Sequence, residues 1–373
     1  MSDSRPLSLS SCNFDLYMNE IAQWFVPAIV SEPTLSRIQE VLSALPGKTT
    51  NAIGLEFYPS DSDYDCDISL SIDPFVDKNE LIAWRPDEFN KNYKNHTLIR
   101  DITFIPEIVG IWEDPQSRLS EVIKEMIPEI DLRAPVTNNI PLNIFLTLVQ
   151  NCDPGKIRDI LSPVLSGKLD GTEKSNIPAC LDRIAKLPKD LFITHLGFMV
   201  GRPSKAIRVL IRCKTVNLCS VLRTLGLNTE EYLSFGEFFN IIQPRCSFVV
   251  IAANMFQQGI GTDFAVECGI VEPEKPDADE WWADFIGAIG ALGHWDAQIS
   301  TMLHVQTLIK RRSALLQTND YVNNPIKWGL NHIKLSFSKK ERPTMKWYMA
   351  MHGVAANASV NRAKANQPGY KLS

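Results

Sequence analysis

The stretch Ile53-Gly54-Leu55-Glu56-Phe57-Tyr58 places an apolar residue at every second position. A second stretch, Asp67-Ile68-Ser69-Leu70-Ser71-Ile72-Asp73, alternates in the same way after a connection rich in Asp and Ser. Strict alternation is typical of a β-strand with one buried face and one polar face. We therefore predict that the two stretches form a hairpin, with residues 59–65 as its loop.

The two-strand pattern recurs along the chain, and helical patterns separate its copies. Clear alternation pairs residues 191–200 with 206–214, 246–256 with 262–271, and 331–338 with 344–351, and a less regular pair joins 103–113 with 140–150. Apolar spacing of three and four residues predicts helices at 15–45 (divided by prolines), 154–165, 177–185, 216–225 and 279–316. The chain thus reads as five hairpins separated by helices.

The polar faces of these strands decide between two folds. The apolar faces pack against the helices in either case. A flat antiparallel sheet would then point the polar faces at solvent, whereas a closed barrel would point them into a lumen. The regular repeat favours an α+β fold: an antiparallel ten-stranded barrel of repeated αββα units with helices outside. We predict one domain over residues 1–373, with an ordered core from about 14 to 360 and a tail over 361–373.

Composition excludes several classes of protein. The 38 Lys and Arg residues against 43 Asp and Glu residues, with a formal net charge of -5, argue against a broad basic surface for nucleic acid or anionic membrane. No apolar run reaches the roughly 20 residues of a membrane helix, and the polar N-terminal residues do not resemble a signal peptide, so we predict a cytoplasmic protein. The 8 cysteines are scattered without zinc-site spacing, which predicts thiols and no protein metal site.

The polar strand faces carry the residues that could perform chemistry. They are the basic side chains Arg208, Arg212, Lys334 and Lys346, the carboxylates Glu56, Glu113, Asp263 and Glu267, the phenols Tyr58 and Tyr348, and the imidazoles His195 and His332. Arginine and lysine bind phosphate oxygens, and an enclosed carboxylate either acts as a base or needs a partner. Several enclosed carboxylates would suit an amine-bearing substrate, or magnesium with a diphosphate. A solvated strand face accounts for the same residues, so the pattern alone leaves both interpretations open.

Three short stretches point to a known family. Residues 52–57, 206–211 and 346–352 occur in the order of three strands of a prenyltransferase barrel. The chain resembles the aromatic prenyltransferases of the ABBA (prenyltransferase-barrel) superfamily, particularly the dimethylallyltryptophan synthase type. The resemblance implies that Glu56 accepts a hydrogen bond from the aromatic acceptor and takes its proton. It also implies basic contacts to the diphosphate from Arg208 and from the last strand, which carries Lys346.

Allyl transfer supplies roles for the remaining candidates. It needs cations for the leaving diphosphate, a walled pocket for the allylic cation and a base near the nucleophile. Arg208, Arg212, Lys334 and Lys346 are expected to bind the diphosphate, and Tyr58 and Tyr348 to shield the cation. The expected partners are an isoprenyl diphosphate and an indole, phenol or peptide acceptor. No cofactor is expected to be required, although magnesium remains an option.

The sequence also departs from the family pattern. The fourth hairpin carries Thr262-Asp263-Phe264-Ala265-Val266-Glu267, which is acidic where the family is basic. Asp67 and Ser69 lie where an arginine is expected, and Leu210 lies where a tyrosine would shield the cation. These departures leave an alternative function: a barrel that binds or otherwise modifies a peptide or small metabolite without a prenyl diphosphate. They also leave, as an alternative fold, an open sheet whose polar faces are exposed to solvent.

Overall fold

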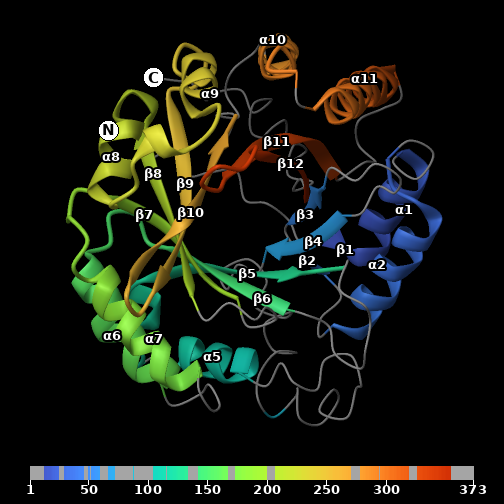
Figure 1. Cartoon of the computed structure of the whole chain (residues 1–373). Helices are drawn as coiled ribbons and strands as arrows, with labels where there is room; N and C mark the ends of the chain where they lie inside the picture. The colour runs from blue at the N-terminus through green and yellow to red at the C-terminus, as the bar shows by residue number, and fades with distance from the viewer. Residues whose placement is uncertain are drawn as a thin grey trace, which may run out of the picture.

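A closed antiparallel barrel forms the centre of the computed structural model (Figure 1). The structure describes residues 12–24, 29–45, 49–50, 52–58, 66–71, 87, 104–114, 116–132, 142–166, 173–199, 206–269, 278–293, 295–318 and 326–353. The predicted loop at 59–65 and the predicted tail at 361–373 lie outside these residues. The predicted closure of the sheet is confirmed, and an open sheet is thereby excluded.

The barrel contains ten strands, each paired with two neighbours. Around the barrel their order is β10, β11, β12, β3, β4, β5, β6, β7, β8 and β9. The strands are β3 (Ala52–Phe57), β4 (Cys66–Ser71), β5 (Ile123–Ile130), β6 (Leu142–Leu148), β7 (Phe192–Phe198), β8 (Ile207–Lys214), β9 (Phe248–Phe256), β10 (Gly259–Cys268), β11 (Ile326–Phe337) and β12 (Thr344–Gly353). Two short strands, β1 (Cys12–Asn13) and β2 (Thr49–Thr50), pair outside it.

The helices lie around the outside of the barrel (Figure 1). They are α1 (Phe14–Trp24), α2 (Glu32–Ala44), α5 (Phe104–Glu113), α6 (Pro154–Ser166), α7 (Glu173–Ile184), α8 (Leu218–Thr224), α9 (Phe235–Ile242), α10 (Ala278–Gly290) and α11 (Asp296–Thr318). Short 3-10 turns occur at Leu119–Glu121, Thr215–Asn217 and Thr229–Glu231. No described helix has both the length and the apolar character to cross a bilayer.

The main hydrophobic core lies between the outer faces of the strands and the helices. On β12 and β3, Trp347 is paired with Phe57, and their rings stack with centroids 4.1 Å apart. On another side of the barrel, Phe235 of α9 packs edge-on against Phe264 of β10 and Phe337 of β11. The apolar half of each alternating strand is therefore buried under a helix, and its polar half faces the interior.

Two predicted elements differ from the structure. Residues 104–113 form α5 rather than a strand, and the first strand of that hairpin is β5. A short apolar run does not distinguish a strand from a helix by periodicity alone, and here Ile108, Val109 and Trp112 are buried on one helical face. The predicted helix at 279–316 is two helices, α10 and α11, and α9 was not predicted.

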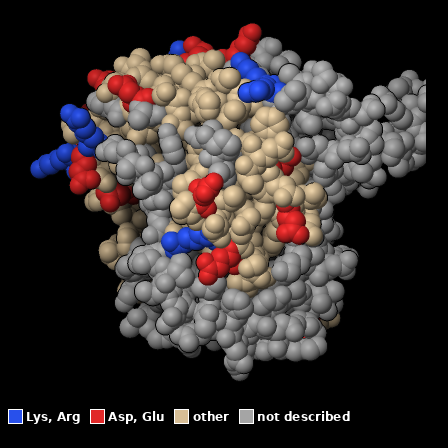
Figure 2. All heavy atoms as spheres, turned by 90° about the vertical axis from the view of Figure 1, so that its right-hand side faces the viewer, with Lys and Arg blue, Asp and Glu red and all other residues tan. Residues whose placement is uncertain are grey.

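The described residues on the side that carries α1 and α2 include charges of both signs (Figure 2). Figure 2 shows acidic and basic side chains scattered among the described residues of this face.

Candidate active site inside the barrel

One part of the inner wall is apolar. Its buried side chains form a cluster separate from the main core: Phe145, Met199, Leu210, Val250, Ala252 and Ala265, with Ile127 packed against them. These residues alternate along their strands with residues of the main core, as Leu210 does between Val209 and Ile211. The cluster therefore lines the interior along β5 to β10.

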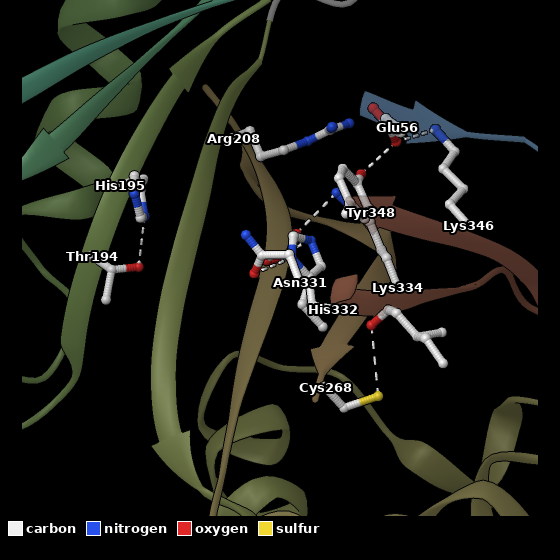
Figure 3. A network of polar contacts seen from close by, with 12 residues as sticks. Glu56, Thr194, His195, Arg208, Cys268, Asn331, His332, Lys334, Lys346 and Tyr348 are labelled. Atoms are coloured by element: carbon white, nitrogen blue, oxygen red, sulfur yellow. Dashed lines mark hydrogen bonds and ion pairs between the residues drawn. The ribbon is translucent and has the colours of Figure 1, made fainter. Parts of the chain in front are cut away.

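Glu56, Tyr348 and Lys346 form a polar group on the neighbouring strands β3 and β12 (Figure 3). The strand register places Tyr348 opposite Glu56, and the Tyr348 hydroxyl donates a hydrogen bond to Glu56 Oε1. Lys346 Nζ lies 3.0 Å from the same carboxylate oxygen. Glu56 is only 6% exposed, so this ion pair is enclosed by the barrel.

The surroundings of Glu56 keep it ionised. Burial alone would raise the pKa of this carboxyl group. The positive charges of Lys346 and Lys334, with hydrogen bonds from Tyr348 and Lys346, outweigh burial and lower the pKa of the carboxyl group to about 2. A group with such a low pKa accepts hydrogen bonds well but is a weak proton acceptor. This differs from the expectation that Glu56 takes the proton of the substrate.

A second ion pair lies on the next strands around the barrel. Lys334 of β11 is opposite Glu267 of β10, and Lys334 Nζ lies 3.0 Å from Glu267 Oε1. Burial raises the pKa of Glu267, but the charge of Lys334 and a hydrogen bond from Lys334 hold this pKa below its ordinary value. His332 Nε2 lies 4.0 Å from Glu267, and burial lowers the pKa of His332 to about 4, so this imidazole is neutral near pH 7.

Both tyrosines lie against cations. Lys346 Nζ lies 3.9 Å from the centre of the Tyr58 ring, and the Tyr58 hydroxyl donates a hydrogen bond to Asp67. The Tyr348 ring stacks on His332 with centroids 3.9 Å apart and has Lys334 Nζ 5.8 Å from its centre. Burial, and then the Glu56 carboxylate, raise the pKa of Tyr348 well above its ordinary value, so it is a neutral hydrogen-bond donor. Aromatic faces in this arrangement attract positive charge.

The two arginines of β8 complete the basic set. Arg208 extends into the interior (Figure 3), and its Nε donates a hydrogen bond to Asn254 Oδ1 at 3.2 Å. The Arg212 guanidinium lies 4.5 Å above the Phe248 ring. Neither arginine forms an ion pair with a carboxylate in the described part of the chain. Their charges are thus less compensated than those of Lys334 and Lys346.

Comparison with known proteins identifies the architecture. No family model matches the chain, and no curated protein matches its sequence. Solved structures do match: the prenyltransferase PriB in its ternary complex with L-tryptophan and dimethylallyl thiolodiphosphate has a TM-score of 0.52 at 11% identity, over 92% of this chain and 96% of PriB. The fold is the ABBA prenyltransferase barrel. The match at this low identity concerns the fold alone.

Two further solved structures are also similar to this chain. The 5-dimethylallyltryptophan synthase from Streptomyces coelicolor has 10% identity and a TM-score of 0.49 over 91% of this chain and 95% of its own. The prenyltransferase NotF has 11% identity and a TM-score of 0.41 over 89% of this chain and 87% of its own.

Two predicted carboxylates are not enclosed in the interior of the barrel. Glu113 was expected on a strand, but it is the last residue of the outer helix α5. Asp263 is exposed, and it lies where a register shift between Ile260 and Phe264 interrupts the pairing of β10 with β9. Of the predicted acidic residues, only Glu56 and Glu267 are therefore enclosed in the interior.

Sequence analysis missed other inward-facing polar residues. They are Asp67 on β4, Glu125 and Glu129 on β5, and Asn143 and Thr147 on β6. Glu125 accepts hydrogen bonds from Ser71 and, at 3.0 Å, from Thr147. A register shift between Ile123 and Glu125 breaks the alternation of β5, so the pattern that marked the other strands is hidden there. Asp67 alternates correctly and could have been found from the sequence.

The described residues of the interior do not form a metal centre. Within the described ranges, no three His, Cys, Asp or Glu side chains are grouped so that they could hold a metal ion. The enclosed carboxylates are instead engaged by lysine, tyrosine, serine and threonine side chains. The chemistry available to the described residues is thus cation binding by aromatic faces, anion binding by basic groups and hydrogen bonding to carboxylates.

Proposed function

We propose that this barrel is an aromatic-type prenyltransferase, which moves an allylic group from an isoprenyl diphosphate to an indole, a phenol or a peptide side chain. The observation that carries the proposal is the group of Glu56, Tyr348 and Lys346 inside a closed barrel. It brings a hydrogen-bond acceptor, an aromatic face and a cation together, and allyl transfer needs all three. The PriB complex, whose fold is the same, contains an aromatic amino acid and an allylic diphosphate analogue.

The basic residues would hold the leaving group. Lys334 and Lys346 would share their charges between their carboxylates and the diphosphate oxygens, and Arg208 and Arg212 would add bidentate contacts. The bond from the allylic carbon to oxygen breaks, and its electron pair stays on the diphosphate. The faces of Tyr58 and Tyr348 would then stabilise the allylic cation, and the barrel wall would exclude water.

Glu56 would orient the acceptor. Its pKa of about 2 means that it is ionised near neutral pH and can accept a hydrogen bond from an N–H or O–H group. Ionised oxygen atoms accept more than one hydrogen bond, so Glu56 can bind the acceptor while Tyr348 and Lys346 remain in place.

Ligand stabilisation tests the donor site. We expect dimethylallyl thiolodiphosphate to raise the melting temperature of the purified protein, because a ligand at 100 times its Kd adds about 2.7 kcal/mol to native-state stability. The assay is run with and without magnesium, and with ten- and fifteen-carbon analogues. Lys346→Ala should abolish the shift, whereas Lys310→Ala on the outer helix α11 should retain it.

Turnover tests the transfer itself. Incubation with dimethylallyl diphosphate and a panel of L-tryptophan, phenols and peptides should yield a product heavier by one dimethylallyl group in mass spectrometry. Stabilisation without any product would leave a diphosphate-binding barrel and remove the assignment to transfer onto these acceptors.

The charge pairing of the lysines favours one alternative function. Each of Lys334 and Lys346 already has a buried carboxylate partner, so part of the basic set is neutralised in the ligand-free barrel. Such a lumen would suit a peptide or small metabolite without a diphosphate. The absence of a thermal shift with all three analogues would favour this function over prenyl transfer.

We also propose that the protein works in a reducing compartment such as the cytoplasm. No disulfide joins the cysteines in the part of the chain that the structure describes. Reduced thiols are typical of such compartments.

A further inference from the structure

A β-bulge on β7 turns one histidine toward the interior. Ile193 of the outer face is opposite Ile211, but His195, two residues later, is opposite Leu210, so Thr194 is an extra residue. Without this extra residue, strict alternation from Ile193 would put His195 on the outer face. The bulge instead aligns His195 with Leu210, which belongs to the inner apolar cluster.

The Thr194 hydroxyl lies within hydrogen-bonding distance of one ring nitrogen of His195 (Figure 3). The Thr194 hydroxyl donates its only proton to the Leu210 carbonyl oxygen at 3.2 Å. His195 Nδ1 lies 3.0 Å from the same hydroxyl oxygen, which can therefore only accept from Nδ1–H. In a neutral imidazole the other nitrogen, Nε2, then has an unshared electron pair.

The surroundings of His195 contain charges of both signs. Glu267 of β10 and Glu125 of β5 favour the protonated ring, whereas Lys124 of β5 opposes it. His332 of β11 also lies within electrostatic range of His195. On the neighbouring strands β6 and β8, the residues opposite His195 are uncharged: Thr147 and Leu210. Burial is the largest influence and lowers the pKa of His195 below its ordinary value of 6.5, so the ring is neutral at pH 7.

We propose that His195 Nε2 is the general base of the transfer reaction, an inference that rests on the proposed function. After the carbon–oxygen bond to diphosphate has broken, the acceptor atom uses an electron pair to form the bond to the allylic carbon of the cation. The proton lost by the acceptor passes to Nε2, which yields a neutral product and an imidazolium that later releases the proton to water. Thr194 is the positioning residue.

In this assignment, Glu56 orients the acceptor and His195 removes its proton. Glu56 is already held by Lys346 and Tyr348, and its pKa of about 2 makes it a poor proton acceptor. A neutral imidazole is a stronger base and needs no counter-charge in its resting state. His332 is a weaker candidate, because its ring is covered by the stacked Tyr348 ring.

Nitrogen NMR of the full-length protein labelled with ¹⁵N-histidine tests the tautomer without any substrate. The His195 signals are those that disappear in His195→Gln. We expect a neutral Nδ1–H ring at pH 7 in the wild type, and a mixture with the Nε2–H form in Thr194→Val. An Nε2–H ring or an imidazolium at pH 7 in the wild type would overturn the proposal, even if the diphosphate analogue binds.

Kinetics with the acceptor found in the turnover assay test the role in catalysis. In the wild type, kcat should fall on the acid side through a pKa below 6.5. His195→Gln should lower kcat by about 100-fold or more, remove this acid limb and leave binding of dimethylallyl thiolodiphosphate unchanged. His352→Gln is the matched control, since His352 is another inward histidine with a pKa lowered by burial, and it should retain the acid limb.

The two proposals fail in different ways. If no allylic diphosphate binds or reacts, the transferase function fails in the assays of the preceding section. If transfer occurs and His195→Gln keeps the wild-type kcat and acid limb, prenyl transfer stands and His195 is excluded as its base.

Discussion

Glu56 shows how one enclosed carboxylate couples stability to chemistry. In Glu56→Gln, Lys346 loses its counter-charge and the amide still fills the site, so we expect turnover to fall while the affinity for the diphosphate analogue stays equal or rises. We also expect a loss of about 1–3 kcal/mol in unfolding free energy, because a buried hydrogen-bonded partner is left without its charge. Urea denaturation and steady-state kinetics measure the two effects.

The matched control for this change is Glu121→Gln. Glu121 also forms ion pairs, with Arg118 at 2.9 Å and Lys156 at 3.0 Å, but on an exposed surface where water screens the charges. The unfolding free energy of the Glu121→Gln variant should therefore be close to that of the wild type. Equal effects of both substitutions on unfolding would contradict the enclosed position of Glu56.

At the scale of strands, the inner wall depends on close packing between neighbours. A Cβ atom on Gly197 of β7 would lie 2.5 Å from Phe145 Cε1 of β6, so Gly197→Ala must displace a ring of the apolar wall. We expect a loss of about 1–3 kcal/mol in unfolding free energy, measured by urea denaturation. Gly236→Ala on α9, where the new Cβ would meet open space, should instead stabilise by up to about 1 kcal/mol. A wild-type stability of Gly197→Ala would show that the Phe145 ring is free to move.

At the scale of the whole barrel, the enclosed ionisable groups make stability depend on pH. The pKa of His332 is about 4 in the folded protein and near 6.5 when unfolded, so between these values the unfolded chain binds more protons. The contribution of His332 to the unfolding free energy is therefore complete above about pH 6.5. It is lost as the pH falls toward 4, by up to about 1.4 kcal/mol per pH unit. Glu56, with a pKa of about 2 against an ordinary 4.5, adds a second loss between those values.

Unfolding free energies from urea denaturation at several pH values between 7.5 and 4 test this dependence. His332→Gln should reduce the slope between pH 6.5 and 4 and leave the loss below pH 4.5 in place. A wild-type unfolding free energy that stays constant between pH 6.5 and 4.5 would contradict a buried neutral His332.

The alternation of apolar and polar residues determined most of the fold. It predicted the faces of β3, β4, β8, β11 and β12, because side chains of a strand point to opposite sides with a period of two residues. The prediction failed at α5 and β5. There a short apolar run suited a helix as well as a strand, and a register shift hid the inward Glu125.

The sequence by itself determined that Glu56, Lys334, Lys346, Arg208 and Tyr348 share the polar faces of strands, since that depends only on local periodicity. Only the tertiary structure decided their partners, because pairing across strands depends on the register and on barrel closure, which join residues as distant as Glu56 and Tyr348. The low pKa of Glu56 and the orientation of the His195 ring have the same origin. Both arise from neighbours that are remote in sequence or from a bulge that only pairing reveals.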